Sequence, residues 1–181
     1  MTRFGYIAVT QLALLVIGGS ALSHPLPRLV WNATASAPIG LYALQPVHEI
    51  HRHQQVAVRP PEPIATYLAK GGYLPKGVLL LKQVLAVHGQ TVCRFGTTIT
   101  IDGTTVGLAK LHDHLGRRLP VWQGCHHLRH DQVFLMNPAV EGSLDGRYFG
   151  PFPAATIIAT AHPVWTDETG DGHFVWHARR H

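Results

Sequence analysis

A single lysine interrupts one of the most apolar stretches of the chain, and a serine lies in a turn-forming segment upstream of it. Lys82 stands inside VLLLKQVLAV, residues 78–87, and Ser36 begins SAPIGLY, residues 36–42. Burial among apolar side chains disfavours a charged ammonium group and lowers its pKa. A neutral amine can take the proton of a serine hydroxyl. The two residues could therefore form a nucleophile and its general base.

Each residue also has an ordinary structural interpretation. A lysine can extend its amine to the surface from a strand end or pair with a carboxylate. Serine, proline and glycine suit a turn, because proline fixes φ and glycine accepts a positive φ. Lowering the lysine pKa from ~10.4 to about 7 or 8 corresponds to roughly 3 to 5 kcal/mol of differential solvation, which an apolar pocket can supply. The surroundings of the amine decide between the two interpretations.

The segments that would position these residues are mostly strands. The run 78–87 predicts a strand buried on both faces. Other apolar or alternating segments predict further strands at 41–47, 55–58, 91–95, 97–102, 104–109, 132–137 and 156–165. Asp102-Gly103 is a hairpin signal. One short helix is expected at 64–70, and residues 107–130 look irregular. A mostly β domain is the expected fold.

Composition excludes several classes of protein. The chain of 181 residues is 46% hydrophobic and 14% charged, which argues for one folded domain and against disorder. The net charge is +5, but the basic residues are scattered, so a nucleic-acid groove is not expected. The 14 histidines form no complete ligand pattern such as HExxH, so we expect no metal and no other cofactor. The chain has no GxSxG segment of the kind that holds the nucleophile of many Ser-His-Asp hydrolases, so we do not expect a Ser-His-Asp triad.

The N-terminal segment from Phe4 to Leu22 carries no charge and follows Arg3. Roughly 20 apolar residues span a bilayer, so we expect residues 1–23 to be a transmembrane anchor with a cytoplasmic N-terminus. The alternative is a cleaved signal peptide, because Ala21 and Ser23 are small residues at the required spacing. Under either interpretation the domain at 24–166 is exported. Residues 167–181 are expected to be a flexible, solvated tail.

The only two cysteines are Cys93 and Cys125. In an exported chain the simplest expectation is a disulfide, worth roughly 3 to 4.7 kcal/mol in the chain-entropy model. Two unrelated buried thiols are the alternative.

Four segments in order form a larger pattern. NATASAPIGLY, VLLLKQVLAVHGQTVC, GRRLPVWQGC and VFLMNPAVEGSLDGRYFGP resemble the TraF-type conjugative transfer peptidases, a branch of the type I signal peptidase family. The resemblance covers nearly the whole chain. It implies a signal-peptidase-like β-barrel or sandwich domain behind one N-terminal transmembrane helix.

The resemblance also implies a role for each matching residue. Ser36 is the nucleophile and Lys82 the general base, while the Thr34 hydroxyl joins the Ser36 backbone N–H in the oxyanion hole. Ser143 orients the lysine. Asp145 and Arg147 are the acidic and basic members of the SxDSR block that brace the site.

Three departures from the family pattern are present. Gly89-Gln90 replaces the usual Gly-Asp, SLDGR replaces SxDSR with Gly146 at a usual serine, and MNP replaces GDN with only Asn137 retained. None of them alters the serine or the lysine, so they bear on the bracing of the site.

The implied function is a membrane-anchored serine endopeptidase of the bacterial inner membrane. Its domain would lie in the periplasm and would mature a conjugative pilin precursor by hydrolysis or cyclisation. A general type I signal peptidase and a non-catalytic assembly factor of a secretion apparatus are the alternatives. The expected partners are the protein substrate and the membrane lipid around the N-terminal segment.

Overall fold

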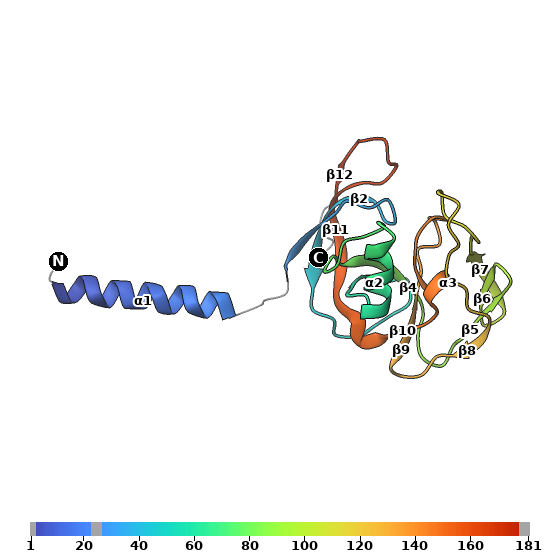
Figure 1. The fold of residues 1–181 in the computed structure, drawn as a ribbon, viewed down its shortest axis with the longest axis horizontal. Coiled ribbons are helices and arrows are strands. Elements are labelled where there is room, and N and C mark those ends of the chain that lie inside the picture. Colours follow the sequence, from blue (N-terminus) through green and yellow to red (C-terminus); the bar gives the residue numbers. More distant parts are fainter. Residues whose placement is uncertain (1–2, 23–26, 178–181) are drawn as a thin grey trace.

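The computed structural model of the chain describes residues 3–22 and 27–177 and consists of two antiparallel sheets with short helices packed on them (Figure 1). The larger sheet has eight strands, in the order β1-β2-β11-β3-β4-β9-β10, and β12 also pairs with β11. Its strands are β1 (Leu29–Asn32), β2 (Ile39–Gln45), β3 (Gln55–Val58), β4 (Leu80–Ala86), β9 (Gln132–Leu135), β10 (Phe152–Pro153), β11 (Ile157–Asp167) and β12 (Val175–Trp176).

The smaller sheet has four strands in the order β7-β6-β5-β8 and lies beside the β4 and β9 end of the larger one (Figure 1). Its strands are β5 (Thr91–Phe95), β6 (Thr98–Ile101), β7 (Thr104–Leu108) and β8 (Gly124–His127). The predicted turn at Asp102-Gly103 connects β6 to β7, and both residues have positive φ. Strand β8 falls in the stretch 107–130 that local sequence suggested was irregular.

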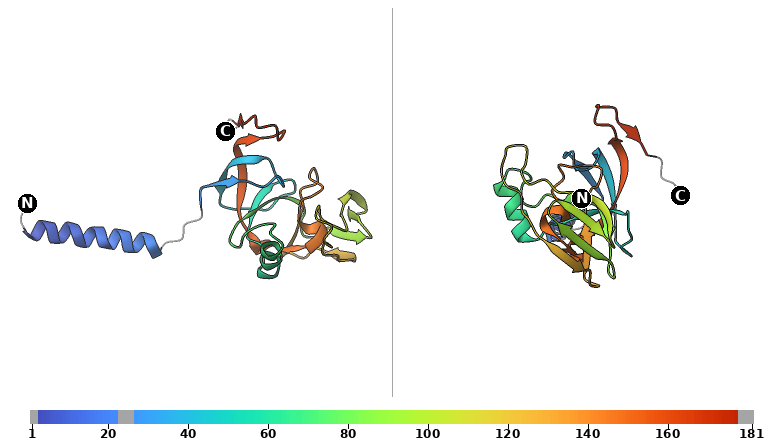
Figure 2. Two further views of the ribbon diagram at one scale, coloured as in Figure 1. Left: turned by 45° about the horizontal axis from the view of Figure 1, so that its top comes forward. Right: turned by 90° about the vertical axis from the view of Figure 1, so that its right-hand side faces the viewer.

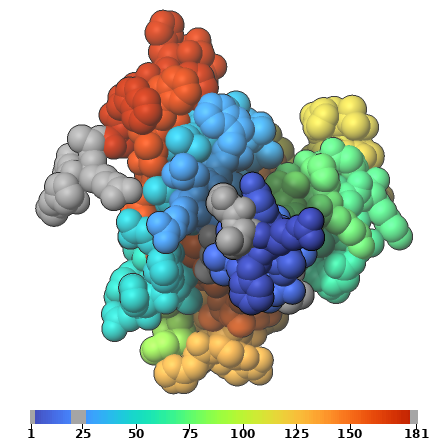
Figure 3. Space-filling model, turned by 90° about the vertical axis from the view of Figure 1, so that its left-hand side faces the viewer, coloured from blue at the N-terminus to red at the C-terminus, as the bar shows by residue number. Residues whose placement is uncertain are grey.

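The helices are α1 (Arg3–Leu22), α2 (Glu62–Lys70), α3 (Gly146–Phe149) and the 3-10 turn η1 (Ala154–Thr156). Helix α1 projects from the β body in Figure 1 and in the left view of Figure 2, and Figure 3 looks at the molecule from the side of this helix. Within the described ranges, no helix combines the length and the apolar character that crossing a membrane requires. Ser23, part of the alternative cleavage site, lies outside the described residues.

The strand at the centre of the predicted chemistry is confirmed. All residues of β4 except Gln83 are buried, as its continuous apolar sequence predicts. Side chains alternate between the two faces of a strand. Leu80 and Val84 pack in one core cluster with Leu68 of α2, whereas Leu81 packs in a second cluster with Tyr42 of β2. Lys82 therefore faces the side of the sheet that α2 covers.

Two expectations about architecture are corrected. The described strands form open sheets and no closed barrel, because the outer strands β1 and β10 do not pair with each other. The segment after residue 167, expected to be a flexible, solvated tail, forms a hairpin as far as residue 177, because β12 pairs with β11. Trp176 stacks on Trp165 with ring centroids 5.6 Å apart, and buried Asp167 accepts hydrogen bonds from the backbone of Gly170 and Gly172. The last four residues of the expected tail, 178–181, are outside the described part.

Candidate active site

The Lys82 side chain is enclosed by the protein. The residue is 1% exposed. Burial lowers the pKa of its amine from the ordinary 10.5 to about 8, and the nearby Arg147 also lowers it, whereas Asp145 acts in the opposite direction. Desolvation of the charged form prevails because the amine has little access to water. The neutral form of the amine is consequently a minor species near pH 7 and becomes the major one above about pH 8.

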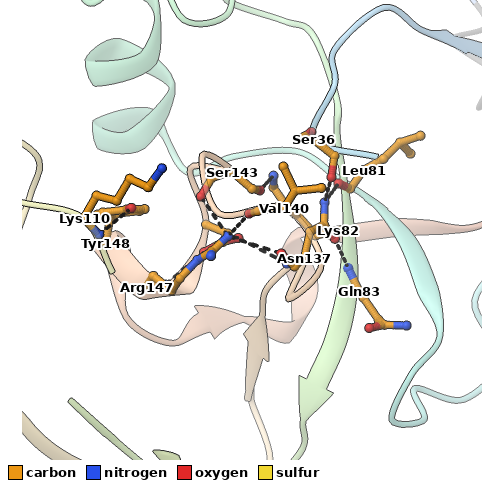
Figure 4. A network of polar contacts seen from close by, with 11 residues as sticks. Ser36, Leu81, Lys82, Gln83, Lys110, Asn137, Val140, Ser143, Arg147 and Tyr148 are labelled. Carbon is orange, nitrogen blue, oxygen red and sulfur yellow. Dashed lines mark hydrogen bonds and ion pairs between the residues drawn. The ribbon is translucent and has the colours of Figure 1, made fainter. Parts of the chain in front are cut away.

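The amine has one hydroxyl partner. Lys82 Nζ donates to Ser143 Oγ over 2.7 Å, and both groups are buried. The partner is neutral and can accept, so it fixes the direction of the amine without attracting its proton as a carboxylate would. The contact joins β4 to the loop between β9 and α3 (Figure 4).

The loop that carries Ser143 is held by a buried ion pair. Arg147 Nε and Nη2 contact Asp145 Oδ1 and Oδ2 at 3.0 and 2.9 Å, and both side chains are at most 1% exposed. The same Nη2 also donates to the backbone oxygens of Val140 and Ser143 at 2.6 and 3.2 Å. Asp145 additionally caps the first turn of α3 by accepting from the Arg147 backbone N–H. The pair thus fixes the backbone from which the Ser143 hydroxyl reaches the amine.

Ser36 lies in a turn that Asn32 organises. Asn32 Nδ2 donates to the backbone oxygens of Thr34, Ala37 and Pro38 at 2.9, 3.0 and 3.1 Å. Asn32 Oδ1 accepts from the Thr34 hydroxyl at 2.9 Å and from its backbone N–H at 3.2 Å. The Thr34 hydroxyl has only one proton and directs it to Asn32. In the contact between Thr34 Oγ1 and Ser36 Oγ, 3.1 Å long, Ser36 is therefore the donor.

A cavity of about 480 Å³ unites the predicted residues. Thr34, Ser36, Lys82 and Ser143 all line it. Among the described contacts no hydrogen bond joins Ser36 Oγ to Lys82 Nζ, because each polar group contacts its own hydroxyl neighbour. Hydrogen bonds of this kind are often long in an unliganded site and tighten when substrate binds. Asp145 and Arg147 lie behind the cavity wall.

The far wall of the cavity is fastened by a polar contact. Tyr73, which follows α2, donates its hydroxyl to Asp113 Oδ2 at 2.6 Å, and Arg117 Nε contacts the same carboxylate oxygen at 2.7 Å. Arg117 Nη1 also reaches the Gly71 oxygen at 2.8 Å. The segment 110–119 is thereby held against the end of α2, and apolar side chains cover the space between them. Leu68, Leu74, Leu119 and Leu144 are among the lining residues.

Comparison with known proteins places this arrangement in a family. The family model described as "Signal peptidase, peptidase S26" matches residues 1–166. The chain belongs to the S26 signal peptidase family. A probable conjugal transfer protein TraF of Sinorhizobium fredii is 36% identical over 75% of this chain and 76% of its own length. A plasmid transfer protein TraF of Escherichia coli is 32% identical over 92% of this chain and 99% of its own length.

These relatives confirm the resemblance to TraF-type proteins that the four sequence segments indicate, and membership of the S26 family supports a protease. A solved signal peptidase I of Enterococcus faecalis is 15% identical to this S26 family member. It matches over 63% of this chain and 97% of its own, with a TM-score of 0.38.

The glycine in SLDGR has a steric cause in this member of the family. A Cβ atom at Gly146 would lie 2.7 Å from the backbone oxygen of Leu135 and 2.6 Å from the Phe134 ring. The serine that the family usually carries at this position therefore does not fit against β9. The departure preserves the positions of Asp145 and Arg147 on either side.

The glutamine in Gly89-Gln90 is also accommodated in this structure. Gln90 Nε2 donates to Asp102 Oδ2 at 2.7 Å, and the other oxygen of Asp102 accepts from the Thr91 backbone N–H at 2.8 Å. A carboxylate is thus present at this turn, supplied by the β6–β7 hairpin instead of by the residue after Gly89.

The two cysteines do not line the cavity. Cys93 of β5 and Cys125 of β8 face each other in register, and their sulfurs form a disulfide 2.05 Å long. The bond links β8 to β5 within the smaller sheet. It therefore stabilises this sheet and not the wall of the cavity.

Sequence reasoning missed the part played by two asparagines. Asn32 organises the Ser36 turn, and Asn137 contacts the backbone on both sides of the site. An Asn two residues before a Thr-x-Ser segment is a weak indicator of such a turn, since asparagine side chains commonly bind backbone groups near them.

Proposed function

We propose that this chain is a serine endopeptidase in which Ser36 is the nucleophile and Lys82 the general base. The observation that carries the proposal is the enclosed amine: Lys82, 1% exposed, donates to the Ser143 hydroxyl at 2.7 Å within the cavity that Ser36 also lines. Purely structural lysines are almost never fully buried without a charged partner. Here the described hydrogen-bond partner of the amine is a neutral hydroxyl.

In the proposed mechanism the Ser36 hydroxyl turns from Thr34 toward Lys82 when substrate enters. The neutral amine takes the hydroxyl proton as Ser36 Oγ attacks the scissile carbonyl carbon, giving a tetrahedral oxyanion. Lys82, now an ammonium, passes the proton to the leaving nitrogen, and the peptide bond breaks to an acyl-enzyme. A water or an amino group of the substrate then attacks the ester carbon and gives its proton to Lys82, which passes it to Ser36 Oγ as the ester bond breaks. The serine hydroxyl is restored and the product is hydrolysed or cyclic.

The oxyanion is stabilised by two donors, the Ser36 backbone N–H and the Thr34 hydroxyl. In the unliganded structure the Thr34 hydroxyl donates to Asn32 Oδ1, so this hydroxyl must rotate toward the oxyanion. Preorganised donors of this kind are among the largest contributions to catalysis.

The proposed substrate is a conjugative pilin precursor at the periplasmic face of the inner membrane. The conjugal and plasmid transfer proteins to which the chain is similar support this choice. Helix α1 would serve as the membrane anchor, with lipid as its partner. The apolar leucines of the cavity wall would receive substrate side chains, and an extended substrate backbone would pair beside Ser36.

The test is to replace Ser36 and Lys82 separately, as Ser36→Ala and Lys82→Ala, and to follow processing of the pilin precursor by mass spectrometry. Both variants should accumulate unprocessed precursor while remaining folded. Cleavage that survives both substitutions would leave the chain as a non-catalytic assembly factor. Cleavage of many unrelated preproteins by the wild-type chain would favour a general signal peptidase.

A further inference from the structure

Asn137 connects the backbone of the proposed nucleophile to the strand of the proposed base. Its Nδ2 donates to the backbone oxygen of Ser36 and to that of Leu81, the latter at 3.0 Å. Its Oδ1 accepts from the backbone N–H of Gln83 at 2.9 Å. One side-chain amide thus binds the residues on either side of Lys82 in β4 and, at the same time, the peptide group of Ser36 (Figure 4).

Asn137 is itself fixed at both ends of its backbone. Its N–H donates to Asp145 Oδ2 at 3.1 Å, and its oxygen accepts from Arg147 Nη2 at 3.2 Å. The residue is 7% exposed. Because the Asp145–Arg147 pair also holds the Ser143 loop, the same rigid unit determines where Ser143, Lys82 and Ser36 lie.

We infer that Asn137 is a positioning residue that sets the Ser36 turn at its working distance from the Lys82 amine. The inference rests on the proposed function. The turn belongs to the segment between β1 and β2, whereas Lys82 is on β4, and these strands are not neighbours in the sheet. Sheet pairing therefore does not fix the separation of the two groups directly, and the Asn137 amide bridges that gap.

The inference predicts a specific kinetic defect. Asn137→Asp keeps the size and the acceptor oxygen but replaces the donor, so the Ser36 and Leu81 oxygens would face another oxygen. Asn137→Ala removes all three side-chain bonds. A small misplacement of reacting groups costs up to ~10² in rate, so kcat should fall by about tenfold or more in both variants. The Michaelis constant should change by less than about threefold, because the cavity lining is retained.

The pH profile separates positioning of Ser36 from a change around the amine. Burial and the Ser143 hydroxyl remain in Asn137→Ala, so the midpoint of its kcat/KM profile should stay within about half a pH unit of the wild type. Asn137→Asp is left out of this comparison, because its new carboxylate would raise the pKa of the amine. Gln123→Ala is the matched control. It removes a side-chain amide that likewise binds backbone groups, in this case the N–H and the oxygen of Gly96 in the turn between β5 and β6. Its kcat should equal that of the wild type.

The inference is overturned if Asn137→Ala keeps the wild-type kcat, if only the Michaelis constant changes, or if the midpoint of the profile moves with the rate. If neither variant folds, the wild-type full chain supplies the test through hydrogen exchange of the Asn137 side-chain amide. Slow exchange of both Nδ2 protons supports the bridge, and exchange at the rate of an exposed amide overturns it.

The two proposals fail in distinguishable ways. Loss of cleavage in Ser36→Ala together with wild-type kcat in Asn137→Ala would remove only the positioning role. Persisting cleavage in Ser36→Ala and Lys82→Ala would remove the proposed function itself.

Discussion

Lys82 Nζ donates to Ser143 Oγ over 2.7 Å, although the two residues are 61 positions apart in the chain. The contact gives the amine a direction without giving it a counter-charge. The carboxylate of Asp145, which raises the pKa of the amine, is bound instead by Arg147, which lowers it. Burial then prevails and lowers the pKa of the amine to about 8, as the proposed role of general base requires.

Activity should rise with pH through the pKa of Lys82. This pKa is lowered to about 8 from 10.5, and the proton-accepting form of the amine is the neutral one. Below pH 8, kcat/KM should fall about tenfold for each pH unit, and above it the profile should level off. Steady-state cleavage of a precursor peptide measures the profile. A flat profile from pH 5 to 9 would contradict Lys82 as the base.

The pH dependence of stability at Lys82 should have the same sign as that of a salt-bridged carboxylate, because in both cases the pKa is lower in the folded chain than in the unfolded chain. Between about pH 8 and 10.5 the folded chain binds fewer protons at Lys82 than the unfolded chain, so the free energy of unfolding rises with pH in that window. Lys82→Met should be inactive and should lose this rise, gaining stability on the order of 3 kcal/mol at pH 7. Urea unfolding at pH 7 and 9.5 measures both effects, and an unchanged rise in the Met variant would contradict the assignment.

Removing the Ser143 hydroxyl should affect rate more than folding. Ser143→Ala leaves Lys82 without its hydroxyl partner, so we expect kcat to fall by ~10- to 100-fold as the amine loses its orientation. Ser143→Thr keeps a hydroxyl and should retain more activity. Thr156→Ala is the control, because it removes a hydroxyl of similar bond length, 2.7 Å to Pro153, at an exposed position. Equal rates for Ser143→Ala and the control would exclude the orienting role.

The Thr34 hydroxyl can be tested by a substitution of nearly equal shape. Thr34→Val removes the side-chain donor and keeps the backbone N–H of Ser36, so kcat should fall by ~10². Thr34→Ser should restore most of the rate. A Thr34→Val variant within threefold of the wild type would show that the oxyanion is stabilised by other groups.

The buried ion pair should matter to stability far more than a surface pair. Arg147→Ala leaves Asp145 buried and unpaired, which should cost about 3 to 5 kcal/mol of unfolding free energy. Arg129→Ala breaks a pair whose side chains are both 72% exposed, and should cost ~0 to 1 kcal/mol. Denaturant titration of both variants measures the contrast. Similar costs would mean that the Ser143 loop is held by its backbone alone.

Reduction of the disulfide should destabilise the domain without altering the site. The bond closes a loop of 32 residues, worth roughly 3 to 4 kcal/mol in the chain-entropy model. The melting temperature should therefore fall with reductant, while activity well below that temperature persists, because Cys93 and Cys125 lie outside the cavity. A double Cys→Ser variant should no longer respond to reductant. Equal melting temperatures of the wild type with and without reductant would contradict a stabilising bond.

The sequence by itself predicted the features that depend on local pattern. A continuous apolar run is typical of a strand buried on both faces, so residues 78–87 predicted the burial of β4 but left open whether the Lys82 amine reached the surface. The hairpin at Asp102-Gly103 followed from turn chemistry. The resemblance of four ordered segments then brought Thr34, Ser36 and Ser143 into one expected site, and all three line the same cavity.

Only the tertiary structure decided which atoms meet. The contacts of Asn137 with Ser36 and Leu81 join residues 101 and 56 positions apart, and no local period encodes such a distance. The hairpin after Asp167 likewise depends on the stacking of Trp176 on Trp165 of β11. The local sequence determines the hydrophobic periodicity of a segment and whether it is buried. The hydrogen-bond partners of its polar groups depend instead on which distant segments pack against it in the folded chain. Each such group must find a partner when buried, and that requirement is met only in the folded chain.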